Sequence, residues 1–206
     1  MSTISIIGAG TMATAIAGRI AKAGHTVEVV NRDPAKARAL ADYLASGAVT
    51  GTYGAAPAGD IVILAVPYAG AAAVVADFGE ALDGKVIIDI ANPVAPDLSG
   101  LVTPHGSSGA QEIARGLPAS AHVVKAFNTI FGHVLAKGRR LDAFIAADDA
   151  EAKARVSTFF ESLGLRPLDV GGLQMAQTLE ALGLMMIGLA KNGANTWDFS
   201  MNVDIG

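Results

Sequence analysis

The feature that most constrains the fold of this chain is a glycine-rich loop near the N-terminus. An apolar run over 3–8 leads into the loop, and residues 11–23 then have helical spacing, with Gly24 as their stop. A G-x-G-x-x-A sequence between a strand and a helix is typical of dinucleotide sites. The first glycine permits a tight turn, and the second lets the backbone approach a pyrophosphate. We therefore predict that a dinucleotide is bound by Gly8, Ala9, Gly10, Thr11, Met12 and Ala13.

Short apolar runs alternate with stretches of helical period along the rest of the chain. Strands are predicted over 26–31, 61–66, 85–90, 122–127, 141–146 and 166–170, and helices over 34–44, 69–82, 108–115, 131–137, 149–163 and 173–192. Strands that are apolar on both faces and separated by helices favour a parallel sheet covered on both sides. We predict an α/β fold, with a Rossmann-like, doubly wound, mostly parallel sheet and C-terminal helices. It forms a single domain, 1–206, with a dinucleotide-binding half over about 1–95 and a second half over about 96–206.

Composition excludes several classes of protein. Hydrophobic residues make up 51% of the chain and charged residues 17%, which excludes intrinsic disorder, and the absence of cysteine excludes disulfides and thiol chemistry. A formal net charge of −4 argues against a nucleic-acid partner. The longest apolar run, 182–190, is about half the roughly 20 residues that a membrane span needs. The N-terminus also lacks the pattern of a signal peptide. We expect a cytoplasmic protein with no membrane or nucleic-acid partner.

The end of the second predicted strand indicates which dinucleotide is bound. NAD sites usually carry an acidic residue there, which bonds the ribose 2′-hydroxyl. Here the residues are Asn31 and Arg32, and Lys36 follows one helical turn later. A guanidinium can bind a 2′-phosphate through two hydrogen bonds, so we predict NADP. Asp33 is interpreted as the cap of the following helix. The alternative is that Arg32 and Lys36 belong to the solvated face of a surface helix.

Three further motifs follow predicted strands, and ligands of open parallel sheets bind beyond such strand ends. They are Ala65-Val66-Pro67, Ala91-Asn92-Pro93 and Phe127-Asn128-Thr129. Lys125, inside a predicted strand, is expected to be paired or to extend its amine to the surface rather than to be catalytic. No nucleophile motif is present, and the four histidines are scattered, so we expect no catalytic side chain and no metal ligands. Hydride transfer between two bound cofactors needs only aligned rings.

Together these motifs resemble the coenzyme F420-dependent NADP oxidoreductases, a family that includes the cytosolic domain of membrane ferric reductases. The resemblance runs from residue 3 to about residue 192. In the family, members that use deazaflavin tend to have G-G-T-G where this chain has Gly8-Ala9-Gly10-Thr11. The matching segments are 8–13, 31–32, 65–67, 89–93, the Val-Lys-Ala-Phe-Asn-Thr stretch at 124–129, and the helix capped by Asp149.

The resemblance implies hydride transfer between NADPH and a small-molecule acceptor, in a homodimer. It implies that NADP is bound by the glycine loop, Asn31, Arg32 and Lys36, with the nicotinamide near Pro67, Ala91 and Asn92. The acceptor ring would lie near Pro93, Phe127, Asn128 and Thr129. The acceptor could be coenzyme F420, FMN, FAD or a small metabolite.

Two other functions remain open from the sequence. One is a non-catalytic NADP(H)-binding redox sensor or regulatory module, since no catalytic acid, base or nucleophile is evident. The other is an imine reductase like pyrroline-5-carboxylate reductase, which the glycine loop also resembles; that family has a sizeable helical C-terminal domain, whereas only one long helix and a tail remain here. Trp197 and Phe199 in that tail are expected to cover the ring pocket or a dimer seam, or simply to pin the tail to the core.

Overall fold

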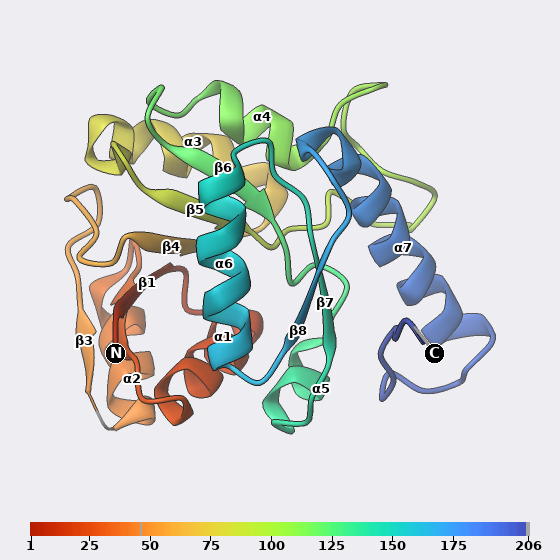
Figure 1. The fold of residues 1–206 in the computed structure, drawn as a ribbon, viewed down its shortest axis with the longest axis horizontal. Helices are drawn as coiled ribbons and strands as arrows, with labels where there is room; N and C mark the ends of the chain where they lie inside the picture. Colours follow the sequence, from red (N-terminus) through yellow and green to blue (C-terminus); the bar gives the residue numbers. More distant parts are fainter. Residues whose placement is uncertain (46, 205–206) are drawn as a thin grey trace.

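A computed structural model describes residues 1–45 and 47–204, and its centre is a six-stranded sheet (Figure 1). All five strand pairs in this sheet are parallel, and the order is β3-β2-β1-β4-β5-β6. The order reverses between β1 and β4, where ligands of open sheets bind beyond the carboxyl ends of the strands. The strands are β1 Thr3–Ile7, β2 Thr26–Val30, β3 Ala48–Thr50, β4 Ile61–Leu64, β5 Val86–Asp89 and β6 His122–Lys125.

Helices cover both faces of the sheet because successive strand residues point to opposite sides. In β1, Ile6 belongs to one apolar cluster and Ile7 to another. Figure 1 shows α3 and α4 on one side of the sheet and α1 and α6 on the other. The predicted doubly wound, mostly parallel fold is therefore confirmed. The helices are α1 Thr11–Lys22, α2 Pro34–Leu44, α3 Tyr68–Phe78, α4 Gly109–Arg115, α5 Gly132–Ala136, α6 Ala150–Ser162 and α7 Ala176–Asn192.

Side-chain caps begin three of these helices, at or next to the predicted helix starts. The carboxylate of Asp33 accepts a hydrogen bond from the backbone N–H of Ala35, and Ser108 Oγ accepts one from that of Gln111. Asp149 caps α6 in the same way, through the N–H of Ala152. These bonds satisfy backbone donors that the first turn of a helix leaves without partners.

Several element boundaries differ from the prediction. The three-residue edge strand β3 was not expected, and the helix predicted over 69–82 divides at Gly79 (φ 47°) into α3 and a 3-10 turn, Gly79–Leu82. The strand predicted over 122–127 ends at Lys125. The strands β7 Asp142–Ile145 and β8 Arg166–Asp169 pair with each other outside the main sheet. They connect to it through an antiparallel bridge between Lys125 and Ala146.

The helical segment 173–192, a 3-10 turn (Leu173–Met175) followed by α7, corrects the expectation that no span of membrane length is present. It is long and apolar enough to cross a membrane, by length and composition alone, and 39% of its 18-residue apolar stretch is buried in the protein. The same segment contains Glu180, whose side chain is fully buried in an ion pair with Lys125 of β6. The face of this segment that carries Glu180 therefore packs against the sheet.

Candidate functional site

The glycine loop joins β1 to α1 at the crevice between β1 and β4. Gly8 has a φ of 129°, and a Cβ there would lie 2.2 Å from the carbonyl oxygen of Ala65. Gly10 is the N-cap of α1, and a Cβ there would meet no atom within 4 Å. Gly10 has no side chain that could cap the helix, so the N–H groups of the first turn have no side-chain partner from the N-cap. This arrangement suits an anion such as a pyrophosphate.

The loop borders three cavities. Its centre, Ala9, Gly10 and Thr11, lines a cavity of about 890 Å³ that extends between α1, α2 and α5. Gly8 lines a second cavity and Met12 a third. The sixth predicted loop residue, Ala13, is buried in the core, as expected for the residue that lets α1 pack closely on the sheet.

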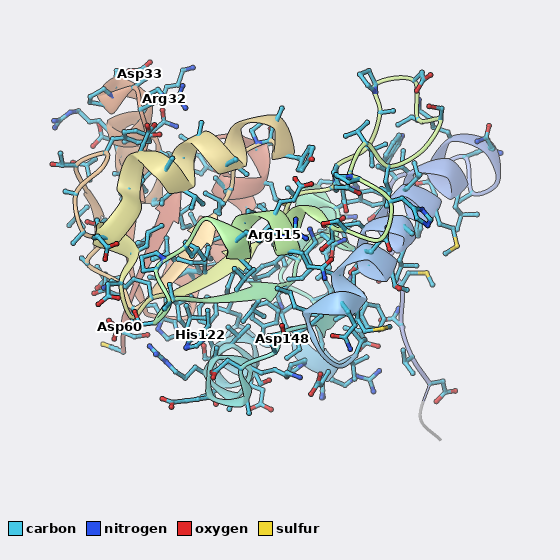
Figure 2. The ribbon with its side chains drawn as sticks, turned by 90° about the horizontal axis from the view of Figure 1, so that it is seen from above. Arg32, Asp33, Asp60, Arg115, His122 and Asp148 are labelled. Carbon is cyan, nitrogen blue, oxygen red and sulfur yellow. The ribbon has the colours of Figure 1, made fainter. Side chains whose placement is uncertain are left out.

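The cavity beside Gly8, of about 540 Å³, holds the predicted phosphate-binding cations; we call it the cation cavity. Among the described residues, Arg32 and Lys36 form no ion pair. Figure 2 shows Arg32 beside Asp33 at the opposite end of the molecule from α7. The cavity is lined by Ile7, Gly8, Asn31, Arg32, Asp33, Lys36, Tyr53, Val66, Pro67, Gly70 and Val74.

The motif after β4 closes the same cavity from the other side. Val66 and Pro67 line it, and Pro67 is the N-cap of α3. Ala65 instead lies against Gly8, because its backbone N–H donates to the carbonyl of Ile7 over 2.9 Å and continues the β1–β4 ladder. The resemblance implies that Pro67 lies with Ala91 and Asn92 at the nicotinamide. In the structure Pro67 lines one cavity with Arg32, and Asn92 lines another.

A smaller cavity of about 290 Å³, which we call the apolar cavity, lies between the ends of β5 and β6 and the helix α7. None of its lining side chains is ionisable. Of the predicted residues, Ala91 and Pro93 are absent from the lining, since the Ala91 carbonyl accepts from Lys125 and Pro93 is buried at the base of the loop after β5. The lining is Met12, Ile90, Asn92, Phe127, Asn128, Thr129, Ile130, Phe131, Gly132, Gly183, Met186, Ile187 and Trp197.

Two asparagines in this lining hold the strand ends and α7 together. Asn92 Nδ2 donates to the backbone carbonyl of Asn128 over 2.8 Å, and Asn128 Nδ2 donates both to Asn92 Oδ1 and to the carbonyl of Leu179, over 2.9 and 2.7 Å. Asn128 Oδ1 is buried and has no hydrogen-bond partner. A buried acceptor left without a donor is costly, so this oxygen is a candidate contact for a bound molecule.

Phe127 shapes the apolar cavity through its backbone. Its φ of 60° is in the left-handed region, which a bulky residue rarely adopts, and such strain is concentrated at functional sites. Its ring is buried against Phe160, with 4.4 Å between the ring centroids. The turn at Phe127 ends the path of β6 and brings Asn128 and Thr129 to the cavity.

A buried charge cluster, Asp89–Lys125–Glu180, joins the ends of β5 and β6 to α7. Lys125 Nζ is 2.7 Å from Asp89 Oδ2 and 3.0 Å from Glu180 Oε1, and all three side chains are at most 1% exposed. Burial raises the pKa of Glu180, and the ammonium of Lys125 opposes that rise. Lys125 also donates to the Ala91 carbonyl. The prediction of a paired rather than catalytic lysine agrees with these contacts; the amine does not reach the surface.

Tyr68, the residue after Pro67, is the phenol nearest in sequence to these strand ends. Its hydroxyl donates to Glu112 Oε2 over 2.8 Å. Burial, assisted by the hydrogen bond to Glu112, raises the pKa of Tyr68 to about 12. Tyr68 therefore stays protonated at neutral pH and cannot serve as a base there.

The tail after α7 turns back over α5 and reaches the apolar cavity. Trp197 lines that cavity and packs edge-on against Phe131, with centroids 5.3 Å apart, while its carbonyl is 2.8 Å from His133 Nε2. Phe199 packs against the same Phe131 ring, and Lys137 pairs with Asp198. Of the expected roles, covering a pocket fits Trp197 and pinning the tail fits Phe199.

Sequence reasoning missed two residues around the site. Tyr53 lines the cation cavity from the loop after β3, and nothing in its sequence context indicates this position. Glu180 completes the buried charge cluster. A lone acidic residue in a strongly apolar helix was a signal that could have predicted a partner for Lys125, because buried carboxylates are almost always paired.

Comparison with known proteins finds similar sequences and a similar fold over most of the chain. A family model described as NADP oxidoreductase, coenzyme F420-dependent, matches residues 3–93. The F420-dependent NADP reductase of Methanothermobacter marburgensis is 30% identical over 201 residues, which cover 88% of this chain and 89% of that protein. A crystal structure of a putative F420-dependent NADP reductase from Arthrobacter sp. FB24 superposes with a TM-score of 0.87 at 28% identity, over 99% of this chain and 100% of that one.

A longer protein is also similar. Metalloreductase STEAP3 of Rattus norvegicus is 31% identical over 187 residues, which cover 89% of this chain. The present chain spans only 37% of the length of that relative.

Proposed function

Because the chain belongs to the family of coenzyme F420-dependent NADP oxidoreductases, we propose that it transfers a hydride between NADPH and coenzyme F420. The observation that carries the proposal is that two chemically different cavities border one glycine loop. Gly8 lines the cation cavity and Met12 lines the apolar cavity. A dinucleotide bound on this loop could therefore place its phosphate-bearing adenosine end in the cation cavity and its nicotinamide near the apolar cavity.

The cation cavity supports NADP as the dinucleotide. Arg32 and Lys36 are exposed cations with no acidic partner among the described residues, and no acidic residue occupies the end of β2. A 2′-phosphate would supply the missing negative charge, and a guanidinium matches phosphate geometry. The pyrophosphate would lie on the first turn of α1, beside Gly10 and Thr11.

The apolar cavity supports a ring-shaped acceptor with a hydrogen-bond donor at its edge. The lining side chains are apolar except for Asn92, Asn128 and Thr129, and the unpartnered oxygen is that of Asn128. A deazaflavin ring has an imide N–H that could donate to this oxygen. The rings of FMN and FAD share this N–H, but the similar proteins carry the name of coenzyme F420.

Hydride transfer between two bound rings needs little chemical participation from side chains. NADPH supplies the hydride, and the acceptor also takes up one proton. The lining side chains of the apolar cavity cannot ionise, so their contribution is to bind, orient and exclude water from two rings.

We extend the proposal to the surroundings of the enzyme. We expect a cytoplasmic homodimer that acts on a small-molecule acceptor and binds neither nucleic acid nor a membrane. The net charge of −4 supports the absence of a nucleic-acid partner, and the buried ion pair inside 173–192 supports the absence of a membrane partner. Light scattering after gel filtration, with and without detergent, tests the oligomeric state and the membrane expectation.

The test of the proposed function is turnover with defined acceptors. NADPH oxidation is followed by the loss of the reduced nicotinamide absorbance, with coenzyme F420, FMN, FAD or a ferric chelate as acceptor. The ferric chelate is included because one relative is named a metalloreductase. We expect turnover with coenzyme F420 well above that with the other acceptors.

Other outcomes would contradict specific parts of the proposal. Faster turnover with FMN, FAD or the chelate would contradict the acceptor but not the NADPH-dependent reaction. Tight NADPH binding without turnover on any acceptor would favour a redox-sensing module instead.

A further inference from the structure

Tyr53 is presented to the cation cavity by a tight turn between β3 and β4. The backbone N–H of Ala55 donates to the carbonyl of Thr52 over 3.2 Å, and Gly54 has a φ of 81°. A positive φ at the third position of a turn requires glycine and fixes the residue before it. A Cβ on Gly54 would be 3.5 Å from the Asp77 carbonyl, so the turn lies against the end of α3.

The side chain of Tyr53 is fixed at both its ring and its hydroxyl. The hydroxyl donates to Asp77 Oδ2 over 2.7 Å, and the ring packs edge-on against Phe78, with centroids 5.1 Å apart. Burial and the Asp77 carboxylate raise the pKa of Tyr53 and the neighbouring Arg32 opposes part of that rise, so the hydroxyl remains a donor. The ring is therefore a rigid wall of the cavity.

Arg32 lies over this wall. Its guanidinium carbon is 5.7 Å from the centroid of the Tyr53 ring, within the range of about 6 Å for a cation–π contact. An exposed arginine otherwise samples many rotamers, and a ligand must pay for fixing one of them. Contact with a held ring restricts the guanidinium before the ligand arrives.

We propose that Tyr53 is a positioning residue for cofactor choice, which holds the Arg32 guanidinium where the 2′-phosphate of NADP binds. The inference rests on the proposed role of Arg32 in binding that phosphate. It extends the specificity site from the end of β2 to a turn more than twenty residues away and to Asp77, which anchors the ring.

A competing role for Tyr53 is direct contact with the adenine ring, and the two roles predict different selectivity. NADH and NADPH carry the same adenine, so loss of an adenine contact weakens both. Loss of Arg32 positioning weakens only the ligand with a 2′-phosphate. Adenosine 2′,5′-bisphosphate and 5′-AMP make the same comparison without the nicotinamide.

The experiment measures dissociation constants of these four ligands by calorimetry for Tyr53→Leu, Tyr53→Phe and Asp77→Ala. Tyr53→Leu should weaken NADPH and the bisphosphate by about two- to fivefold, the strength of an exposed cation–π contact, while NADH and 5′-AMP stay unchanged. Tyr53→Phe keeps the ring and should lose less. Asp77→Ala keeps the ring against Phe78 but removes the acceptor of its hydroxyl. It therefore tests whether the ring must be anchored to position Arg32.

The test is completed by combining Tyr53→Leu with a second substitution that removes one arginine. The effect of Tyr53→Leu should vanish in an Arg32→Ala background and persist in an Arg38→Ala background, since Arg38 is an exposed arginine of α2 outside the cavity lining. Equal losses for all four ligands, no loss for any, or an effect that survives Arg32→Ala would overturn the inference. If Arg32→Ala itself weakened NADPH and NADH equally, the assigned role of Arg32 would fail first.

Discussion

At the scale of single residues, the two glycines of the first loop are required for different reasons. Gly8 is required by the protein, because its backbone has a positive φ and the Ala65 carbonyl occupies the space of a Cβ. At Gly10 the φ of −84° is open to any residue, and no protein atom fills the space beside it. Only a ligand would contact a side chain there.

Alanine at each position should separate these roles. Gly8→Ala should lower the free energy of unfolding by at least about 1–3 kcal/mol from backbone strain, before the clash with Ala65 is counted. Gly10→Ala should leave the melting temperature unchanged and weaken NADPH and NADH alike. Thermal unfolding and calorimetry measure the two effects. A stable Gly10→Ala variant with normal binding of both dinucleotides would contradict a pyrophosphate on this loop.

The second residue-scale prediction concerns Arg32. Arg32→Ala should weaken NADPH by about ten- to a hundredfold, the strength of hydrogen bonds to a charged group, and should weaken NADH little. Arg38→Ala, on the same helix but outside the cavity lining, is the control. Binding titrations with both dinucleotides decide the matter, and similar losses for NADPH and NADH would refute the 2′-phosphate assignment.

Local sequence patterns predict some of these residues and not others. The cap at Asp33 and the neighbouring positions of Arg32 and Lys36 could be predicted, because strand end, cap and helix follow one another within a few residues. Tyr53 could not, since its contact with Arg32 depends on the path of the chain through β3 and the turn at Gly54. Asn128 was predicted from its place after a strand, but its unpartnered oxygen is visible only in the folded protein.

At the scale of elements, the Asp89–Lys125–Glu180 cluster joins β5, β6 and α7. The groups facing Glu180 are the ammonium of Lys125, the carboxylate of Asp89 and the backbone N–H of Gly109, which donates over 3.3 Å. One ammonium serves two carboxylates in a site without water contact. Burial of the second carboxylate is therefore only partly compensated.

This incomplete compensation predicts that the stability of the folded protein depends on pH. Burial raises the folded-state pKa of Glu180 above its ordinary 4.5, so the folded protein binds more protons than the unfolded chain between these two values. The contribution of Glu180 to stability is then fully present below 4.5 and decreases as the pH rises through the folded pKa.

Glu180→Gln should remove that slope. The variant should gain on the wild type by at most about 1.4 kcal/mol per pH unit across the window, because a single proton is involved. Urea unfolding at a series of pH values gives the difference in free energy. A constant difference at all pH values would show that Glu180 does not titrate in this way.

The element pattern was predictable where apolar runs are long and caps are present, as in β1, β4, α2 and α6. It was not predictable for β3, which has three partly exposed residues, or for the end of β6, where the strained turn at Phe127 interrupts an apolar run. The separation of β7 and β8 from the main sheet also has no local signal, since β7 looks like a buried strand of that sheet and β8 is short and partly exposed. The position of this pair depends on contacts with other parts of the chain, such as the bridge between Lys125 and Ala146.

At the scale of the whole molecule, the tail supplies one wall of the apolar cavity through Trp197. Trp197 should contact a bound acceptor, and Trp197→Ala should raise the KM for the acceptor by about two- to tenfold, the strength of an aromatic contact. The dissociation constant of NADPH should not change. Val203→Ala, in the same tail but outside the lining, is the control for general disturbance of the tail. An unchanged acceptor KM would limit Trp197 to a packing role.

The tail is also attached by charges at two separate points. Asp198 pairs with Lys137 of α5, and the carboxylate of Asp142 in β7 binds Arg166 of β8 over 2.6 Å while accepting from the backbone N–H of Val203 over 2.7 Å. Three of these four ionic side chains are 30% or more exposed, so dissolved ions weaken their attraction. A rise in ionic strength is therefore expected to loosen the tail that carries Trp197, and with it one wall of the apolar cavity.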